Sequence, residues 1–170
     1  MKSFLFILFI FLSHVATAQT KGTVTVYAYK QGVAPGAVPK QTMEDGKLVS
    51  APIKPNYNYF TYTASSTTIY PSEIWINKEH FSVSYQKVQS PVEISNSDMI
   101  LNPTSTVLVP KTSKTVLQVT PKDFIKTSRN NKTSAKLSKS NELVLVYKSK
   151  GRFYYVAVKK LKQLQAAAMQ

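Results

Sequence analysis

Apolar residues are densest near the carboxyl end of the chain, in two runs that a short polar segment separates. Leu143–Tyr147 and Phe153–Val158 are rich in β-branched and aromatic residues, and Lys148–Gly151 between them ends in glycine. Two such runs joined by a short glycine-containing segment are typical of a β-hairpin. Both runs are apolar at nearly every position, which is typical of strands covered on both faces. The sequence therefore predicts a hairpin in the middle of a sheet.

Runs in which apolar and polar residues alternate occupy much of the remaining chain. In Thr23–Lys30, Val24, Val26 and Ala28 alternate with threonine and tyrosine, as expected of a half-buried strand. The further strands predicted in this way are Tyr57–Ala64, Glu73–Asn77, Phe81–Val88, Thr106–Val109 and Thr115–Thr120. Roughly seven to nine short strands with connections rich in Pro, Gly, Ser and Thr predict an all-β fold. We expect a single antiparallel β-sandwich or barrel, and the pattern leaves open which of the two.

Two segments between the strands and the carboxyl terminus have weaker patterns. Residues 126–141 contain Ala135 and Leu137 as their only apolar side chains, so we expect an exposed basic loop there. Lys159–Met169 has Leu161 and Leu164 near helical spacing. This segment predicts a short C-terminal helix, with an irregular tail as the alternative.

Residues 1–18 have the layout of a secretory signal peptide. Lys2 supplies a positive charge, Phe4–Leu12 forms an apolar core, and Ala16–Ala18 matches a small-x-small cleavage site. The apolar core is shorter than the ~20 residues that a membrane-spanning helix needs. We therefore expect cleavage between Ala18 and Gln19, followed by export to the periplasm or the extracellular space. Residues 19–170 then form one domain without a transmembrane anchor.

This chain contains few residues that could bind a metal ion or a cofactor. There is no cysteine, and His80 is the only histidine after the predicted cleavage site. Zinc and copper sites need more imidazole or thiolate ligands than this, so we expect no metal and no cofactor. The lack of cysteine also means that an exported domain depends on an ordinary core and not on disulfides.

Charge is the compositional extreme of the chain. After the predicted cleavage site, 21 Lys and Arg residues stand against eight Asp and Glu residues, a net charge of +13. Residues 126–170 contain 11 of these basic residues and Glu142 as their one acid. Such a field attracts polyanions, although a solvated lysine-rich surface is the simpler alternative. Arg129 and Arg152 are the only arginines, which disfavours bidentate recognition of phosphate or carboxylate.

The charge distribution yields one set of candidate binding residues. It comprises Lys126, Arg129, Lys132, Lys136, Lys139, Lys148, Lys150 and Arg152. For an exported protein, the expected partners are anionic polysaccharide, lipopolysaccharide or the surface of an anionic membrane. Sequence-specific nucleic-acid binding is disfavoured, because the chain has no recognition motif for it and export removes most nucleic acids as partners.

An aromatic strand yields the alternative set of binding residues, Tyr57, Tyr59 and Tyr62. Tyrosine rings stack on sugars and bases, and a base–aromatic contact contributes ~1–3 kcal/mol. Tyrosine is also a favoured strand residue, and the sequence favours that simpler interpretation. A carbohydrate- or protein-binding β-module that uses these tyrosines is therefore the second hypothesis.

Catalysis has the weakest support. The chain has no nucleophile motif in a suitable context, and His80 follows a predicted turn, where we expect an exposed structural histidine. Glu73 and Glu79 flank a predicted hairpin and are the best pair of acids for a glycosidase, but neighbouring lysines are the better partners for them. The sequence thus favours a non-enzymatic binding or structural module of the cell envelope or extracellular space over a small hydrolase.

Overall fold

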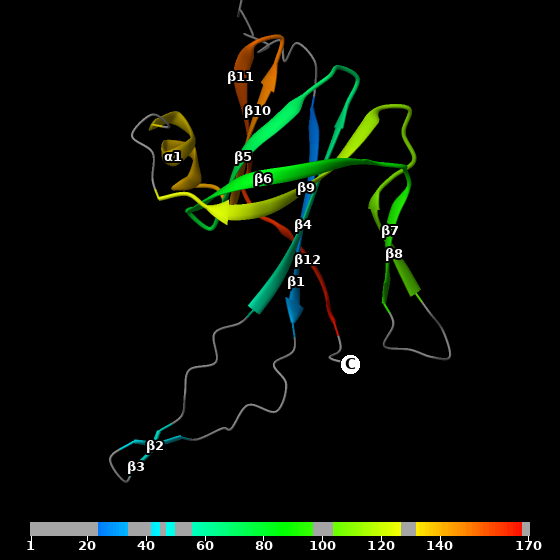
Figure 1. The fold of residues 1–170 in the computed structure, drawn as a ribbon. Coiled ribbons are helices and arrows are strands. Elements are labelled where there is room, and N and C mark those ends of the chain that lie inside the picture. Colours follow the sequence, from blue (N-terminus) through cyan, green and yellow to red (C-terminus); the bar gives the residue numbers. More distant parts are fainter. Residues whose placement is uncertain are drawn as a thin grey trace, which may run out of the picture.

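The structure is a computed structural model that describes residues 24–33, 42–44, 47–49, 56–96, 104–126 and 132–167. The strands of its main sheet are β1 (Thr25–Val33), β4 (Asn56–Ser65), β5 (Tyr70–Ile76), β6 (Glu79–Val88), β9 (Thr115–Phe124), β10 (Leu143–Ser149), β11 (Arg152–Val158) and β12 (Lys162–Ala167). Their order across the sheet is β11-β10-β5-β6-β9-β4-β1-β12. The sheet curls into a half-barrel (Figure 1).

Two small hairpins and one helix complete the described structure. β2 (Thr42–Glu44) pairs with β3 (Lys47–Val49), β7 (Val92–Asn96) pairs with β8 (Thr104–Val109), and α1 comprises Lys132–Ser138. The predicted all-β class is confirmed. The sequence left open a sandwich or a barrel, and the main sheet takes the barrel-like form. Its pairs are antiparallel except β1–β12, which is parallel, so the purely antiparallel arrangement that we expected is wrong at that edge.

Alternate residues of the strands fill the inside of the half-barrel. The buried members of this inner core are Ala28, Ile74, Ile76, Val119, Leu143, Leu145 and Leu161. They come from β1, β5, β9, β10 and the residue before β12, so the core joins strands from both ends of the sheet. The period-two alternation predicted for the half-buried strands is what places these side chains on one face.

The β7–β8 hairpin covers part of the outer face of the sheet. Leu108 and Val109 of β8 pack in one buried cluster with Tyr29, Tyr62 and other residues of that face. The Tyr29 hydroxyl also donates a hydrogen bond to the carbonyl oxygen of Leu108 across 2.6 Å. Strands β1 and β4 are therefore covered on both faces, the inner core on one side and this hairpin on the other.

Helix α1 lies against another part of the outer face, over β5 and β10 (Figure 1). An exposed loop was predicted here, so the prediction is wrong for Lys132–Ser138. The buried residues of the helix are Ser134 and Ser138, one turn apart on the same side. Small side chains allow the helix to approach the sheet closely, and a search for large apolar residues misses that signal.

The C-terminal segment is a strand where a helix was predicted. Lys162–Ala167 forms β12 and pairs with β1, with Lys162 opposite Tyr29. Leu161 lies in the inner core and Leu164 in the outer cluster. Residues three apart lie on one side of a helix but on opposite faces of an extended chain, so two separate cores explain the same spacing.

The C-terminal hairpin is confirmed, but only one of its arms lies inside the sheet. Its turn, Lys150–Gly151, has φ angles of 48° and 78°, as a two-residue type I′ turn requires. β10 lies between β5 and β11 and is buried from Leu143 to Tyr147. β11 is an edge strand that exposes Phe153, Tyr154 and Tyr155, so the mid-sheet prediction is wrong for this arm.

The predicted signal peptide, residues 1–18, lies outside the described residues. Within the described part of the chain, no helix is long and apolar enough to cross a membrane.

Candidate anion-binding site

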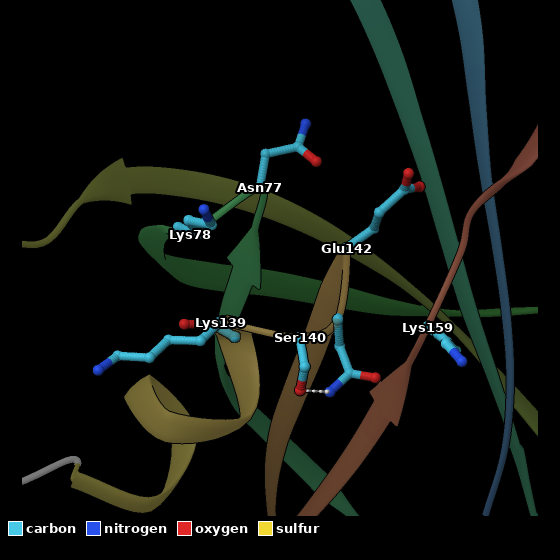
Figure 2. Close-up of a pocket in the computed structure, with 8 residues that line it drawn as sticks. Asn77, Lys78, Lys139, Ser140, Glu142 and Lys159 are labelled. Atoms are coloured by element: carbon cyan, nitrogen blue, oxygen red, sulfur yellow. Dashed lines mark hydrogen bonds between the residues drawn. The ribbon is translucent and has the colours of Figure 1, made fainter.

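One surface depression brings together three lysines from distant parts of the chain. It has a volume of about 400 Å³ and is lined by Asn77, Lys78, Ser138, Lys139, Ser140, Asn141, Glu142 and Lys159 (Figure 2). These residues belong to the β5–β6 turn, to the carboxyl end of α1 and its connection to β10, and to the segment after β11. The depression therefore forms at a junction of three segments.

Hydrogen bonds hold the three segments in place around the depression. The backbone N–H of Asn77 donates to the carbonyl oxygen of Glu142 across 2.9 Å, and the N–H of Glu142 donates to the carbonyl oxygen of Lys159 across 3.3 Å. The Asn141 side chain donates to the carbonyl oxygen of Leu137 across 2.8 Å and so satisfies one free carbonyl at the end of α1. The walls of the depression are thus fixed mainly by backbone groups.

Glu142 is the one acid in this lining, and other parts of the protein bind its carboxylate. Oε2 accepts a hydrogen bond from the backbone N–H of Leu161 across 2.7 Å, and both oxygens lie 3.4 Å from Nζ of Lys30. The Leu161 N–H, and after it Lys30, hold the pKa of Glu142 below its usual value of 4.5. The ionised carboxylate thereby ties β10 to β1 and to the start of β12.

The three lysines of the lining are exposed and carry more positive charge than Glu142 neutralises. Within the described residues, none of Lys78, Lys139 and Lys159 forms an ion pair with a carboxylate. In Figure 2, Lys139 and Lys159 lie on opposite sides of the depression with Glu142 between them. Ammonium groups spread in this way suit the repeated charges of an extended anion better than a single compact ion.

Lys78 occupies a backbone position that lysine rarely adopts. The β5–β6 turn consists of Asn77 and Lys78, whose φ angles are 50° and 74°. Asparagine tolerates this left-handed conformation, but the second position of such a turn normally holds glycine. Conformational outliers of this kind cluster at functional sites, and this one lies at the rim of the depression.

Two of the three tyrosines predicted as a platform lie beside this site. The rings of Tyr57 and Tyr59 have centroids 6.4 Å apart and are tilted by 47°. The Asn77 side chain donates a hydrogen bond to the Tyr59 hydroxyl across 3.0 Å, and Nζ of Lys30 lies 5.8 Å from the centre of the Tyr57 ring. Burial raises the pKa of Tyr59, and Lys30 partly offsets that effect. Tyr62 is buried in the outer cluster, so the structure does not place all three rings together.

The structure divides the predicted basic set into separate groups. Lys139 lines the depression, while Lys132 and Lys136 are exposed on α1 and Lys126 is exposed after β9. Lys148, Lys150 and Arg152 lie around the turn at the far end of the β10–β11 hairpin. Seven strand residues span about 20 Å, so this turn is remote from the depression. Arg129 lies outside the described residues.

Sequence reasoning missed Lys78 and Lys159 as members of the site. Lys78 had one visible signal, because a two-residue hairpin turn without glycine is unusual. Lys159 had none, since its place beside Glu142 depends on the bend between β11 and β12.

His80 and Trp75 form a buried pair on the outer face of β5 and β6. They lie directly opposite each other in the sheet, and their rings stack with centroids 4.3 Å apart and planes 7° apart. Nε2 of His80 lies 2.9 Å from a carboxylate oxygen of Glu73. The expected exposure of His80 is wrong, because only 2% of its surface is accessible, and Trp75 is buried with it.

The two acids weighed for a glycosidase point to different sides of the sheet. Glu73 lies opposite Ser82 on the face that carries His80, and Glu79 precedes His80 and therefore faces the other way. Across the described ranges, no three His, Cys, Asp or Glu residues group so that they could hold a metal ion.

Comparison of this chain with protein-family models, with curated proteins and with solved structures found no match.

Proposed function

We propose that this protein is a non-enzymatic exported binding module that takes an anionic polysaccharide at the depression formed by Lys78, Lys139 and Lys159. One observation carries the proposal: three exposed lysines surround a depression whose single carboxylate is already bound by Leu161 and Lys30. A ligand with several carboxylate, sulfate or phosphate groups would supply the missing negative charge.

The polar lining favours a polysaccharide over a lipid surface. Asn77, Ser140 and Asn141 add amide and hydroxyl groups that can bond the hydroxyls and acidic groups of a sugar chain. Stable binding to a membrane needs an apolar face in addition to basic residues, and the eight residues of the lining include no apolar side chain. The signal-peptide layout of residues 1–18 supports export, and anionic polysaccharides are abundant polyanions outside the cytoplasm.

The adjoining tyrosines support a second candidate function, a carbohydrate-binding module for neutral sugars. Asn77 connects the depression to Tyr59, so one sugar chain could contact both the lysines and the tyrosine pair. If stacking on Tyr57 contributes most of the affinity, a neutral polysaccharide binds as well as an acidic one. In that case the affinity depends little on salt, because no counterions are released.

The experiment compares two triple variants that remove the same charge from different places. The pocket variant carries Lys78→Gly, Lys139→Gln and Lys159→Gln, and the turn variant carries Lys148→Gln, Lys150→Gly and Arg152→Gln. Binding of the purified mature protein to polygalacturonate, dextran sulfate and neutral dextran is measured across a salt series. Low-salt binding decides nothing, because any protein with this net charge adheres to polyanions there.

The proposal predicts that wild type and the turn variant bind an acidic polymer near physiological salt and that the pocket variant does not. At about 1 kcal/mol for each lysine, three substitutions lower the affinity by about 100-fold. Equal loss in both variants would mean that the charge is only a solvated surface. A larger loss in the turn variant would move the site to the β10–β11 turn.

A further inference from the structure

β11 has the composition of a covered strand but lies at the edge of the sheet. One side of β11 pairs with β10 along its whole length, and no other strand of the eight-stranded sheet pairs with it. Phe153 is 59% exposed, Tyr154 39% and Tyr155 38%. A strand that is apolar on both faces normally lies inside a sheet, whereas among the described residues β11 has a partner strand on one side only.

The strand β11 itself has no bulge, proline or central charge that would prevent strand addition at its outer edge. Its register with β10 runs without a bulge from Arg152 to Val158, and no proline or charged residue lies between its ends. Protected edges in monomeric proteins usually have a charge, a proline or a bulge in the middle of the strand. Among the described residues β11 also contacts α1 and β1, but neither pairs with it as a strand, so its seven regular residues form a template for one more strand.

Charges at the two ends of β11 indicate what kind of extended segment could pair with its free edge. Lys148, Lys150 and Arg152 are grouped at its start, and Lys159 and Lys160 follow its end. A second copy of β11 would bring basic residues together at both ends, in a parallel as well as in an antiparallel arrangement. Like charges placed opposite each other destabilise a strand pair, so self-pairing is disfavoured.

We propose that β11 is a docking edge for an extended segment of a partner protein, with apolar residues at the centre of that segment and acidic residues at both ends. Backbone hydrogen bonds to β11 supply affinity, and Phe153 and Tyr155 on one face with Tyr154 on the other cover the apolar side chains of the segment. The acidic ends meet Arg152 at one end and Lys160 at the other. This site is separate from the proposed polysaccharide site and does not depend on it.

The hairpin geometry identifies the backbone groups that are free for docking. In a hairpin with a two-residue turn, the residues that flank the turn form a hydrogen-bonded pair, here Ser149 and Arg152. Arg152, Tyr154, Val156 and Val158 then bond to β10. The N–H groups of Phe153, Tyr155 and Ala157 therefore point away from β10, to the free edge.

The test uses a synthetic peptide of alternating valine and threonine with two aspartates at each end, and a control peptide with lysines in their place. Amide hydrogen exchange is measured by NMR on the full mature protein. We expect the acidic peptide to protect the amides of Phe153, Tyr155 and Ala157, and the lysine peptide to leave them unprotected. Binding without this protection, or equal protection by both peptides, would overturn the proposal.

Substitutions in and beside β11 distinguish the contribution of its backbone hydrogen bonds to peptide binding from the contribution of its charged ends. Tyr155→Pro removes an outward N–H while sparing the bonds to β10, and we expect it to weaken binding of the acidic peptide at least about tenfold relative to Tyr155→Val. If the proline variant fails to fold, Arg152→Glu with Lys160→Glu provides the second test, because it lowers the positive charge at both ends of β11 and should remove most of the preference for the acidic peptide. An unchanged preference for the acidic peptide would contradict the proposal. Protection of the β11 amides that depends on protein concentration alone would also contradict it, because it would identify a second copy of this chain as the occupant.

Discussion

Lys78 has a left-handed backbone conformation that favours glycine, although its lysine side chain belongs to the proposed site. Its φ of 74° costs a non-glycine residue about 1–2 kcal/mol, and glycine would adopt it without strain. Glycine also gains freedom in the unfolded chain, which offsets part of this relief of strain. We therefore expect Lys78→Gly to stabilise the fold by a net amount of about 0.5–1 kcal/mol. The same substitution should lower affinity for an acidic polysaccharide about fivefold, and urea unfolding together with binding at physiological salt measures both effects.

Lys150 offers a matched control for Lys78. It also has a positive φ, 48°, in a two-residue turn, but that turn lies at the other end of β10. Lys150→Gly should therefore increase stability in the same way and leave polysaccharide binding unchanged. An equal loss of affinity in the two variants would mean that binding depends on total charge and not on the depression.

Glu142 links the site to the stability of the fold. Because its pKa is lower in the folded protein than the usual 4.5, its ionised form stabilises the folded state at pH values above the pKa of the unfolded chain. This stabilisation is lost as pH falls from about 4.5 through the lower pKa of the folded protein. At neutral pH, Glu142→Gln should cost about 1.5–3 kcal/mol, since a charged hydrogen bond is lost.

The measurement for Glu142 is urea unfolding of wild type and Glu142→Gln between about pH 7 and about pH 3. We expect the difference between the two proteins to shrink as the pH falls. A difference that stays constant over this range would show that the carboxylate of Glu142 is not held ionised by Leu161 and Lys30.

At the level of elements, β10 and β11 have similar compositions and different environments. Leu145 of β10 is completely buried in the inner core, whereas Phe153 of β11 is 59% exposed. We expect Leu145→Ala to destabilise the protein by about 2–5 kcal/mol and Phe153→Ala to change stability by less than about 0.5 kcal/mol. Thermal or urea unfolding of the two variants measures the difference, and similar costs would mean that β11 is covered in solution.

This pair of strands also shows what the sequence can predict. The apolar runs and the Lys150–Gly151 turn determine a hairpin locally, so the hairpin was predicted correctly. The composition of β11 does not reveal that it lies at an edge, because that depends on which strands pair across the sheet. The same holds for β12, where Leu161 and Leu164 match a helix in spacing but lie in two separate cores.

Helix α1 was missed for a different reason. Its contact with the sheet uses Ser134 and Ser138, whose small polar side chains carry no hydrophobic signal. Serine, threonine and asparagine also dominate the sequence around it, and these residues are typical of loops. Burial of small residues is a tertiary effect, which local pattern reasoning cannot detect.

For the whole molecule, the net charge was visible in the sequence, but its arrangement was not. Lys139 was among the predicted residues, but the depression also needs Lys78 and Lys159, which lie in other segments. The closest link between these segments is the pair of backbone hydrogen bonds at Glu142, one to Asn77 and one to Lys159. The curling of the sheet therefore determines which lysines share a site.

The most direct test of the proposed site is to locate the bound polymer on the protein. Short oligogalacturonates are titrated into isotopically labelled mature protein at physiological salt, and backbone amide shifts are followed by NMR. We expect the largest shifts at Asn77, Lys78, Lys159 and the residues from Lys139 to Glu142, with little change at Lys150. Shifts centred on Lys150, or spread evenly over all lysine-rich surfaces, would contradict the assignment of the depression as the binding site.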